Sequence, residues 1–112
     1  MKQITPAQLK AWLDDRTREP PVLLDVREPW EVAICGIPGS LHLQMQTVPA
    51  RLAELDPARD VVVVCHHGHR SYQVAMFMER NGFSAVHNLF GGVDGWAKQV
   101  DPRHGTLLTR EQ

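Results

Sequence analysis

Hydrophobic residues in this chain fall into short continuous runs, and between the runs they recur every three or four positions. The run at 61–64 consists of four consecutive valines, and the run at 22–26 is interrupted only by Asp25. Aliphatic, β-branched runs of this length are typical of strands that are buried on both faces. Shorter strands are predicted for residues 3–4, 40–43 and 85–89.

The segments between these strands carry signals for helices. Thr5 suits the N-cap of a first helix that reaches about residue 15, Pro6 suits its first position, and Gln8 completes a capping box. The longest helix is predicted for residues 70–80, after which Asn81-Gly82 supplies a left-handed end. Further helical segments are predicted for residues 28–31, for 48–55 with Thr47 as the cap, and for 93–100.

Strands that alternate with helices through short connections indicate an α/β fold with a mainly parallel sheet. A chain of 112 residues is long enough for one such domain, so we expect a single domain over residues 1–112. Residues 103–112 are polar with little periodicity and are predicted to form a loosely held tail. In parallel sheets, ligands bind beyond the carboxyl ends of the strands, and Cys65 follows the valine run at such an end.

Composition and charge narrow the classes of partner. Hydrophobic residues make up 43% of the chain and charged residues 22%, with a formal net charge of −1. This charge gives no electrostatic support for binding nucleic acid. No apolar stretch approaches the length of a membrane span or of a signal-peptide core, and two cysteines do not make a disulfide framework. We therefore expect a cytoplasmic protein with reduced thiols and with neither nucleic acid nor a membrane among its partners.

Residues 65–71, which read CHHGHRS, join the valine run to the longest predicted helix. The backbone amides of a short loop and the positive end of a helix dipole can converge there on an anion. Such surroundings stabilise a thiolate and would make Cys65 a nucleophile. The alternative is a buried structural thiol, which is the commonest role of cysteine.

Two further residues of this loop favour the nucleophile. Gly68 permits a backbone turn that residues with side chains resist. Arg70 is expected to bond backbone carbonyls, or a carboxylate such as Asp25 or Glu31, and so to keep the loop amides pointing inward. Packing alone explains a glycine and an arginine at these positions poorly.

The loop resembles the active-site loop of the rhodanese sulfurtransferases, in which Cys, four intervening residues and Arg are followed by Ser or Thr, here Ser71. Residues 24–27 with Glu31 resemble the first-strand motif of that family. Residues 37–40 resemble its loop before the second main strand, and 91–96 with Pro102 resemble its C-terminal signature. The four motifs occur in the family's order and cover about residues 22–102.

The resemblance implies a single-domain rhodanese with a central five-stranded, mainly parallel sheet that carries helices on both faces. It also implies transfer of sulfane sulfur through a persulfide on Cys65, without a cofactor. The donor would be a small anion such as thiosulfate. The acceptor would be cyanide in an assay, or a cellular thiol such as that of a thioredoxin-like protein. The substrate-binding residues that the resemblance implies are His66, His67, Gly68, His69, Arg70 and Ser71, with Arg27 at the pocket mouth.

The chain departs from the family pattern at two places. Cys35-Gly36 stands where members often carry Gly-His, and the loop holds three histidines where members tuned to thiosulfate usually carry Arg or Lys. As partly protonated imidazoles, these histidines would attract an anionic donor near or below pH 6.5. The alternative is that they are exposed and merely tolerated, and both interpretations stay open.

These side chains also have alternative roles. Cys65, His66, His67 and His69 are all zinc-type ligands. However, adjacent loop positions rarely converge on one tetrahedral ion and inward-facing amides favour anions, so we expect no metal. Arg27 could instead form a surface ion pair with Glu31. Cys35 is expected to pack in the interior rather than to resolve a persulfide as a disulfide.

Two other functions remain as alternatives. Cysteine phosphatases share the thiolate, amide loop and arginine, but their loops carry one residue more, and no suitably placed aspartic acid is evident here. A rhodanese-like module without catalysis would bind a partner or sense anions, but such modules commonly lack the cysteine. Trp12 and Trp96 are expected in the core, and Trp30 is expected to pack as well, with contact to a partner as its alternative.

Overall fold

Five parallel strands form one sheet, in the spatial order β1-β5-β4-β2-β3. The structure is a computed structural model that describes residues 1–101, so the predicted tail at 103–112 lies outside the described residues. The strand β4 occupies the centre of the sheet, and β1 and β3 form its edges. The strands are β1 (Lys2–Ile4), β2 (Val22–Asp25), β3 (Leu41–His42), β4 (Val61–Val64) and β5 (Val86–Leu89).

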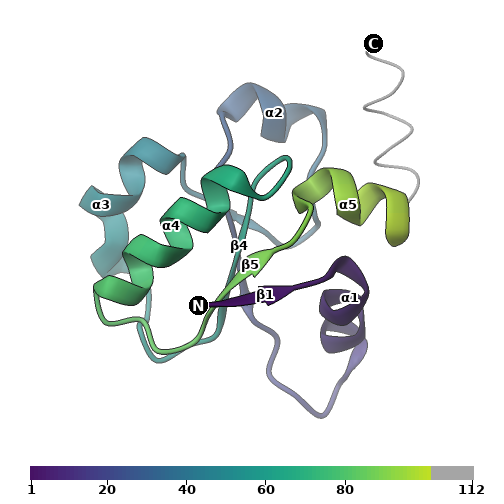
Figure 1. The fold of residues 1–112 in the computed structure, drawn as a ribbon, viewed down its shortest axis with the longest axis horizontal. Coiled ribbons are helices and arrows are strands. Elements are labelled where there is room, and N and C mark those ends of the chain that lie inside the picture. The colour runs from purple at the N-terminus through teal and green to yellow at the C-terminus, as the bar shows by residue number, and fades with distance from the viewer. Residues whose placement is uncertain (102–112) are drawn as a thin grey trace.

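Helices cover both faces of this sheet, as Figure 1 shows. One hydrophobic core lies under α3 and α4, and a second lies under α1 and α5. The short helix α2 lies at the end of the sheet where β2 and β4 finish, beside the loop that precedes α4. The helices are α1 (Pro6–Asp14), α2 (Pro29–Ile34), α3 (Val48–Arg51), α4 (His69–Arg80) and α5 (Gly92–Gln99).

The valine strand β4 is buried on both faces, as predicted. Val61 and Val63 contribute to the core under α3 and α4, whereas Val62 and Val64 contribute to the core under α1 and α5. Full burial of a valine side chain contributes roughly 1.5–3 kcal/mol. The strand is therefore apolar on both faces and fills both cores, and Cys65 follows directly at its end.

The predicted ends of two helices are confirmed. The amide of Gln8 donates to Oγ1 of Thr5 at 3.1 Å, and the amide of Thr5 donates to Oε1 of Gln8 at 2.9 Å, which is a complete capping box. Helix α4 is followed by Gly82 with a φ of +94°, in the left-handed region. The other predicted elements are present with shifted ends, and the turn predicted at 28–31 continues as α2 to Ile34.

The helix predicted for residues 48–55 does begin at Val48 with Thr47 in the N-cap position, but the Thr47 side chain does not cap it and its α-helical part is shorter than predicted. A 3-10 turn begins at Met45, α3 follows only to Arg51, and a second 3-10 turn covers Leu52–Glu54. Thr47 therefore already has helical dihedral angles, and its hydroxyl donates to the carbonyl of Gln44 at 2.7 Å. None of the helices within residues 1–101 has the length and apolar character that crossing a bilayer requires.

Candidate active site

Cys65 lies directly after β4, at the start of the loop that leads into α4. Its side chain is 1% exposed, and its Sγ accepts a hydrogen bond from the backbone amide of Gly68 at 3.0 Å. The Oγ of Ser71 lies 3.2 Å from the same sulfur. Gly68 has a φ of +101°, which glycine adopts without the strain that a side chain would add. The thiol therefore faces the inside of the loop and is contacted by a backbone donor.

The loop amides also adjoin the positive end of a helix. Helix α4 begins at His69 with Gly68 as its N-cap, and no side chain caps it. Within residues 1–101, the backbone amides of His66, His67 and Arg70 donate to no other group. Unpaired amides at a helix N-terminus form a binding site for an anion. A negatively charged group that reaches these amides would be stabilised there.

The carbonyls of the loop are bound by the start of α5. The amide of Val93 donates to the carbonyl of Cys65 at 2.8 Å, and the amide of Asp94 donates to the carbonyl of His66 at 3.0 Å. The N–H and C=O of a trans peptide point in opposite directions, so the amides of His66 and His67 face away from α5. Backbone carbonyls were one of the two kinds of partner expected for Arg70, but α5 binds these two.

Gly92 allows α5 to approach the loop closely, because it has no side chain. A Cβ atom at this position would lie 2.3 Å from the carbonyl oxygen of Cys65 and 2.4 Å from that of His66. The φ of Gly92, +59°, is also in the left-handed region. The second glycine of the Gly-Gly motif is therefore a residue on which the geometry of the loop depends.

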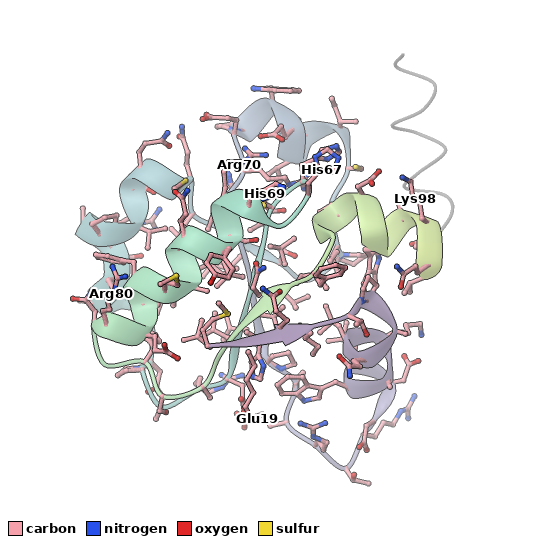
Figure 2. All side chains as sticks on the ribbon, viewed as in Figure 1. Glu19, His67, His69, Arg70, Arg80 and Lys98 are labelled. Atoms are coloured by element: carbon pink, nitrogen blue, oxygen red, sulfur yellow. The ribbon has the colours of Figure 1, made fainter. Side chains whose placement is uncertain are left out.

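Arg70 binds Glu31 and not Asp25. Its Nη1 and Nη2 donate to the two carboxylate oxygens of Glu31 at 2.7 and 2.9 Å, which ties the start of α4 to α2. The hydrogen bonds from Arg70 lower the pKa of Glu31 from 4.5 to about 2, against the opposing effect of burial. Figure 2 places Arg70 at the end of α4 that is nearest α2.

Asp25 pairs with Arg27, and both predicted roles of Arg27 are wrong. Arg27 is 1% exposed, so it neither lines a pocket mouth nor forms a surface pair with Glu31. Its guanidinium donates to the Asp25 carboxylate at 2.8–3.1 Å and to the carbonyl of Cys35 at 2.7 Å. An unpaired buried carboxylate would be costly, which explains why the arginine folds back onto it. Burial alone would lower the pKa of Arg27, but its hydrogen bonds and charge interaction with Asp25 raise it.

Cys35 packs in the interior, in agreement with the sequence interpretation. It is 8% exposed and belongs to the core under α1 and α5, whereas Cys65 belongs to the core on the other face of the sheet. Neither cysteine forms a disulfide. Trp12 and Trp96 are also buried, but Trp30 on α2 is 66% exposed, so the expectation that it packs is wrong.

Asn88 is a residue of the site that the sequence interpretation missed. It is 2% exposed on β5 and accepts a hydrogen bond from the hydroxyl of Ser71. Its Nδ2 donates to the carbonyl of Gly68 at 3.2 Å and to Oε1 of Gln3 at 3.0 Å. An amide side chain in the predicted strand 85–89 was the signal that could have identified it, because buried polar groups need partners.

The three loop histidines occupy different surroundings. The ring centroids of His66 and His67 are 4.0 Å apart, and the Nε2 of His67 lies 3.9 Å from a carboxylate oxygen of Asp94. Burial and the neighbouring His67 lower the pKa of His66. His69 is exposed and lies at the start of α4, apart from His67 (Figure 2).

A cavity of about 450 Å³ lies beside the loop. His67, Gly68 and His69 line it, together with the exposed side chains of Tyr72 and Phe90. Because Cys65 is not among the lining residues, this cavity adjoins the loop on the outside. It offers room for part of a substrate or partner next to the thiol without containing the thiol itself.

Comparisons with known proteins agree with this geometry. A sulfurtransferase of Allochromatium vinosum is 42% identical over 84 residues, which cover 75% of this chain and 74% of the relative. The thiosulfate sulfurtransferase GlpE of Stutzerimonas stutzeri is 37% identical over 75 residues, which cover 67% of this chain and 69% of the relative. The crystal structure of a rhodanese-like domain protein from Staphylococcus aureus is 33% identical, with a TM-score of 0.79 over 86% of this chain and 91% of that chain.

The sequence profile of one family also matches the chain directly. The family is described as Rhodanese-like domain, and the matched residues are 5–99. These residues include the whole loop after β4, its partner helices α2 and α5, and the strands β2 to β5 of the sheet. The chain therefore belongs to the rhodanese-like domain family.

Proposed function

We propose that this protein is a sulfurtransferase that carries sulfane sulfur as a persulfide on Cys65. The observation that carries the proposal is the hydrogen bond from the amide of Gly68 to the Cys65 sulfur, inside a loop that opens a helix. A backbone donor at this position stabilises negative charge on sulfur. The names of the relatives from Allochromatium vinosum and Stutzerimonas stutzeri support the same reaction class.

The first half of the reaction loads the cysteine. After the thiol proton has passed to solvent, the thiolate of Cys65 attacks the outer sulfur of a donor such as thiosulfate. A new sulfur–sulfur bond forms, the sulfur–sulfur bond of the donor breaks, and sulfite leaves with the bonding electron pair. The negative charge then resides on the terminal sulfur of the persulfide. Thiosulfate is chosen as the donor because the relative from Stutzerimonas stutzeri is a thiosulfate sulfurtransferase.

The second half unloads the cysteine. A nucleophilic acceptor, cyanide in an assay or the thiolate of a small molecule or of a thioredoxin-like protein, attacks the terminal sulfur. The bond between the two sulfurs breaks, and the Cys65 thiolate is regenerated with the electron pair. The amides of His66 and His67 face away from α5 and are unpaired within residues 1–101, so they are available to the charge in both halves.

Arg70 and Glu31 have a positioning role in this proposal. Their two hydrogen bonds join α4 to α2 and so restrain the helix end that follows the loop. Ser71 has a second positioning role, because its hydroxyl lies between the Cys65 sulfur and Asn88. His67 and His69 line the cavity beside the loop and are the histidines best placed to meet a donor or acceptor.

Mass spectrometry of the intact protein after incubation with thiosulfate tests the proposal. We expect a gain of one sulfur atom that cyanide reverses and that is absent from Cys65→Ser. Cys35→Ser is the matched control, because Cys35 packs on the other face of the sheet and this variant should keep the gain. Failure of the wild-type protein to gain sulfur from thiosulfate, polysulfide or a low-molecular-weight persulfide would contradict it. Hydrolysis of para-nitrophenyl phosphate that depends on Cys65 would favour a phosphatase instead.

A further inference from the structure

Two elements bring three metal-binding side chains together at the edge of the Cys65 loop. His66 and His67 come from the loop, and Asp94 comes from the first turn of α5. One ligand atom from each residue lies within 4.8 Å of the other two. We propose that these three residues bind one divalent transition-metal ion, for which Zn²⁺ is the best-suited candidate.

The backbone holds the two halves of this site in place. The amide of Asp94 donates to the carbonyl of His66 at 3.0 Å, and the absence of a side chain at Gly92 lets the two segments approach. The sequence argued against a metal because neighbouring loop residues rarely converge on one ion. Here the rings of His66 and His67 are 4.0 Å apart and inclined by 68°, and the third ligand comes from α5.

The donor set suits zinc. Two imidazoles and a carboxylate are common ligands of Zn²⁺, and three protein ligands leave a fourth position for water or an anion. Ligand atoms about 2.0–2.1 Å from a tetrahedral ion lie about 3.4 Å apart. The side chain of His67 is 60% exposed, so its rotation can close the remaining distance.

A charged neighbour of the cluster competes with a metal ion for one of the three ligands. The competing cation is Lys98, whose Nζ lies 3.0 Å from a carboxylate oxygen of Asp94. A metal ion must displace this ammonium group from Asp94, which provides a specific test.

The experiment uses full-length Cys65→Ser, so that a thiolate in the loop cannot supply the ligand. Isothermal titration calorimetry with Zn²⁺ should show saturable binding of one ion per chain at micromolar concentrations. Co²⁺ should give the visible absorption bands of a low-coordinate site without a thiolate-to-cobalt charge-transfer band. No saturable binding of Zn²⁺ up to about 1 mM would overturn the proposal.

Four further substitutions in the Cys65→Ser protein identify the site. Asp94→Asn and His67→Ala should each weaken Zn²⁺ binding about tenfold or more, because each removes a ligand. Lys98→Ala should strengthen binding, because it removes the competing ammonium. His69→Ala is the matched control: this exposed histidine of the same segment lies outside the cluster, and the affinity should not change.

Two results would overturn the assignment to these residues. One is an equal loss of affinity in His69→Ala and His67→Ala, which would indicate adventitious binding to exposed histidines. The other is unchanged affinity in Asp94→Asn when circular dichroism shows the native fold. Since every readout is metal binding by a protein without Cys65, failure here is distinguishable from failure of the sulfurtransferase proposal.

Discussion

Arg70 and Glu31, which are 39 positions apart in the sequence, are joined by two nearly parallel hydrogen bonds between guanidinium and carboxylate. One residue belongs to the first turn of α4 and the other to α2, so this pair connects the two helices that flank the Cys65 loop. Charge-assisted, two-point contacts of this kind fix orientation as well as distance. The pair is therefore expected to affect the geometry of the loop more than the stability of the fold.

Arg70→Lys tests that expectation. Lysine keeps the positive charge but cannot make both hydrogen bonds in the same plane, so the start of α4 should lose its fixed orientation. We expect the rate of persulfide formation to fall about tenfold or more, as measured by rapid quenching and mass spectrometry. Arg80→Lys, at the exposed far end of α4, is the control and should keep the wild-type rate. An unchanged rate in Arg70→Lys would show that the pair does not position the loop.

The same pair predicts how stability depends on pH. The pKa of Glu31 is lowered from 4.5 to about 2 in the folded protein, chiefly by Arg70. A lowered acid pKa stabilises the fold above the unfolded-state pKa, and this contribution is lost as the pH falls toward 2. Glu31→Gln should therefore reduce the free energy of unfolding by about 1–2 kcal/mol at pH 7. This is less than the full pKa shift would give, because Arg70 is partly exposed and solvent screens the pair.

Urea unfolding of both proteins between pH 7 and pH 2 measures this effect. The difference between wild type and Glu31→Gln should stay constant down to about pH 4.5 and then shrink. The exposed pair of Arg51 and Glu54 offers a comparison, and Glu54→Gln should have a smaller effect at pH 7. A stability difference between the two proteins that grows as the pH falls would contradict a stabilising pair of Arg70 and Glu31.

Asn88 and Ser71 are predicted to act as a unit. The Ser71 hydroxyl donates to Asn88, and the Asn88 amide donates to the carbonyl of Gly68, whose own amide binds the Cys65 sulfur. Asn88→Ala leaves both partners unsatisfied in a buried place and should cost about 1–3 kcal/mol of stability. Ser71→Ala and the double variant complete a double-mutant cycle on the rate of persulfide formation. We expect a coupling energy of about 0.5–3 kcal/mol in the activation barrier of that step. Additive effects on that rate would show that the two residues act independently.

Gly92→Ala is predicted to damage the site through steric contact. The added methyl group would lie 2.3 Å from the carbonyl oxygen of Cys65, so α5 or the loop must move. Both stability and the rate of persulfide formation should fall. Gly82→Ala is a matched control, since Gly82 also has a positive φ but has no atom within 4 Å of an added Cβ. Equal losses of stability in the two variants would attribute the effect to backbone strain alone, which costs about 1–3 kcal/mol.

Features encoded in neighbouring residues could be predicted from the sequence. The four valines specified the central strand, and Thr5, Pro6 and Gln8 specified a helix start, because each signal acts over a few positions. The position of Cys65 at the end of the central strand followed from the same local pattern. The segment around Thr47 was predicted only in part, because 3-10 turns precede and follow the short α3 and 3-10 geometry has no strong signature in the residue pattern.

Features that depend on distant contacts could not be predicted in this way. Arg27 directly follows β2, and nothing in its neighbours indicates that its side chain folds back onto Asp25 and reaches the carbonyl of Cys35. The use of α5 to bind the loop carbonyls requires β5 to lie beside β4, which the residue order alone does not specify. The polar contacts of Asn88 depend on the same strand pairing.

The contact between α5 and the carbonyls of Cys65 and His66 has a consequence for the energetics of charge movement. These peptide dipoles are oriented by the fold before any anion arrives, so they need not rotate when charge passes from the cysteine sulfur to an added atom. A solvent-exposed thiol would have to reorganise water at both stages. The peptide dipoles of the loop thus supply a fixed electric field, and the reorganisation energy for the proposed movement of charge is low. Helix α5 holds these dipoles in place, although it supplies no side chain to the sulfur.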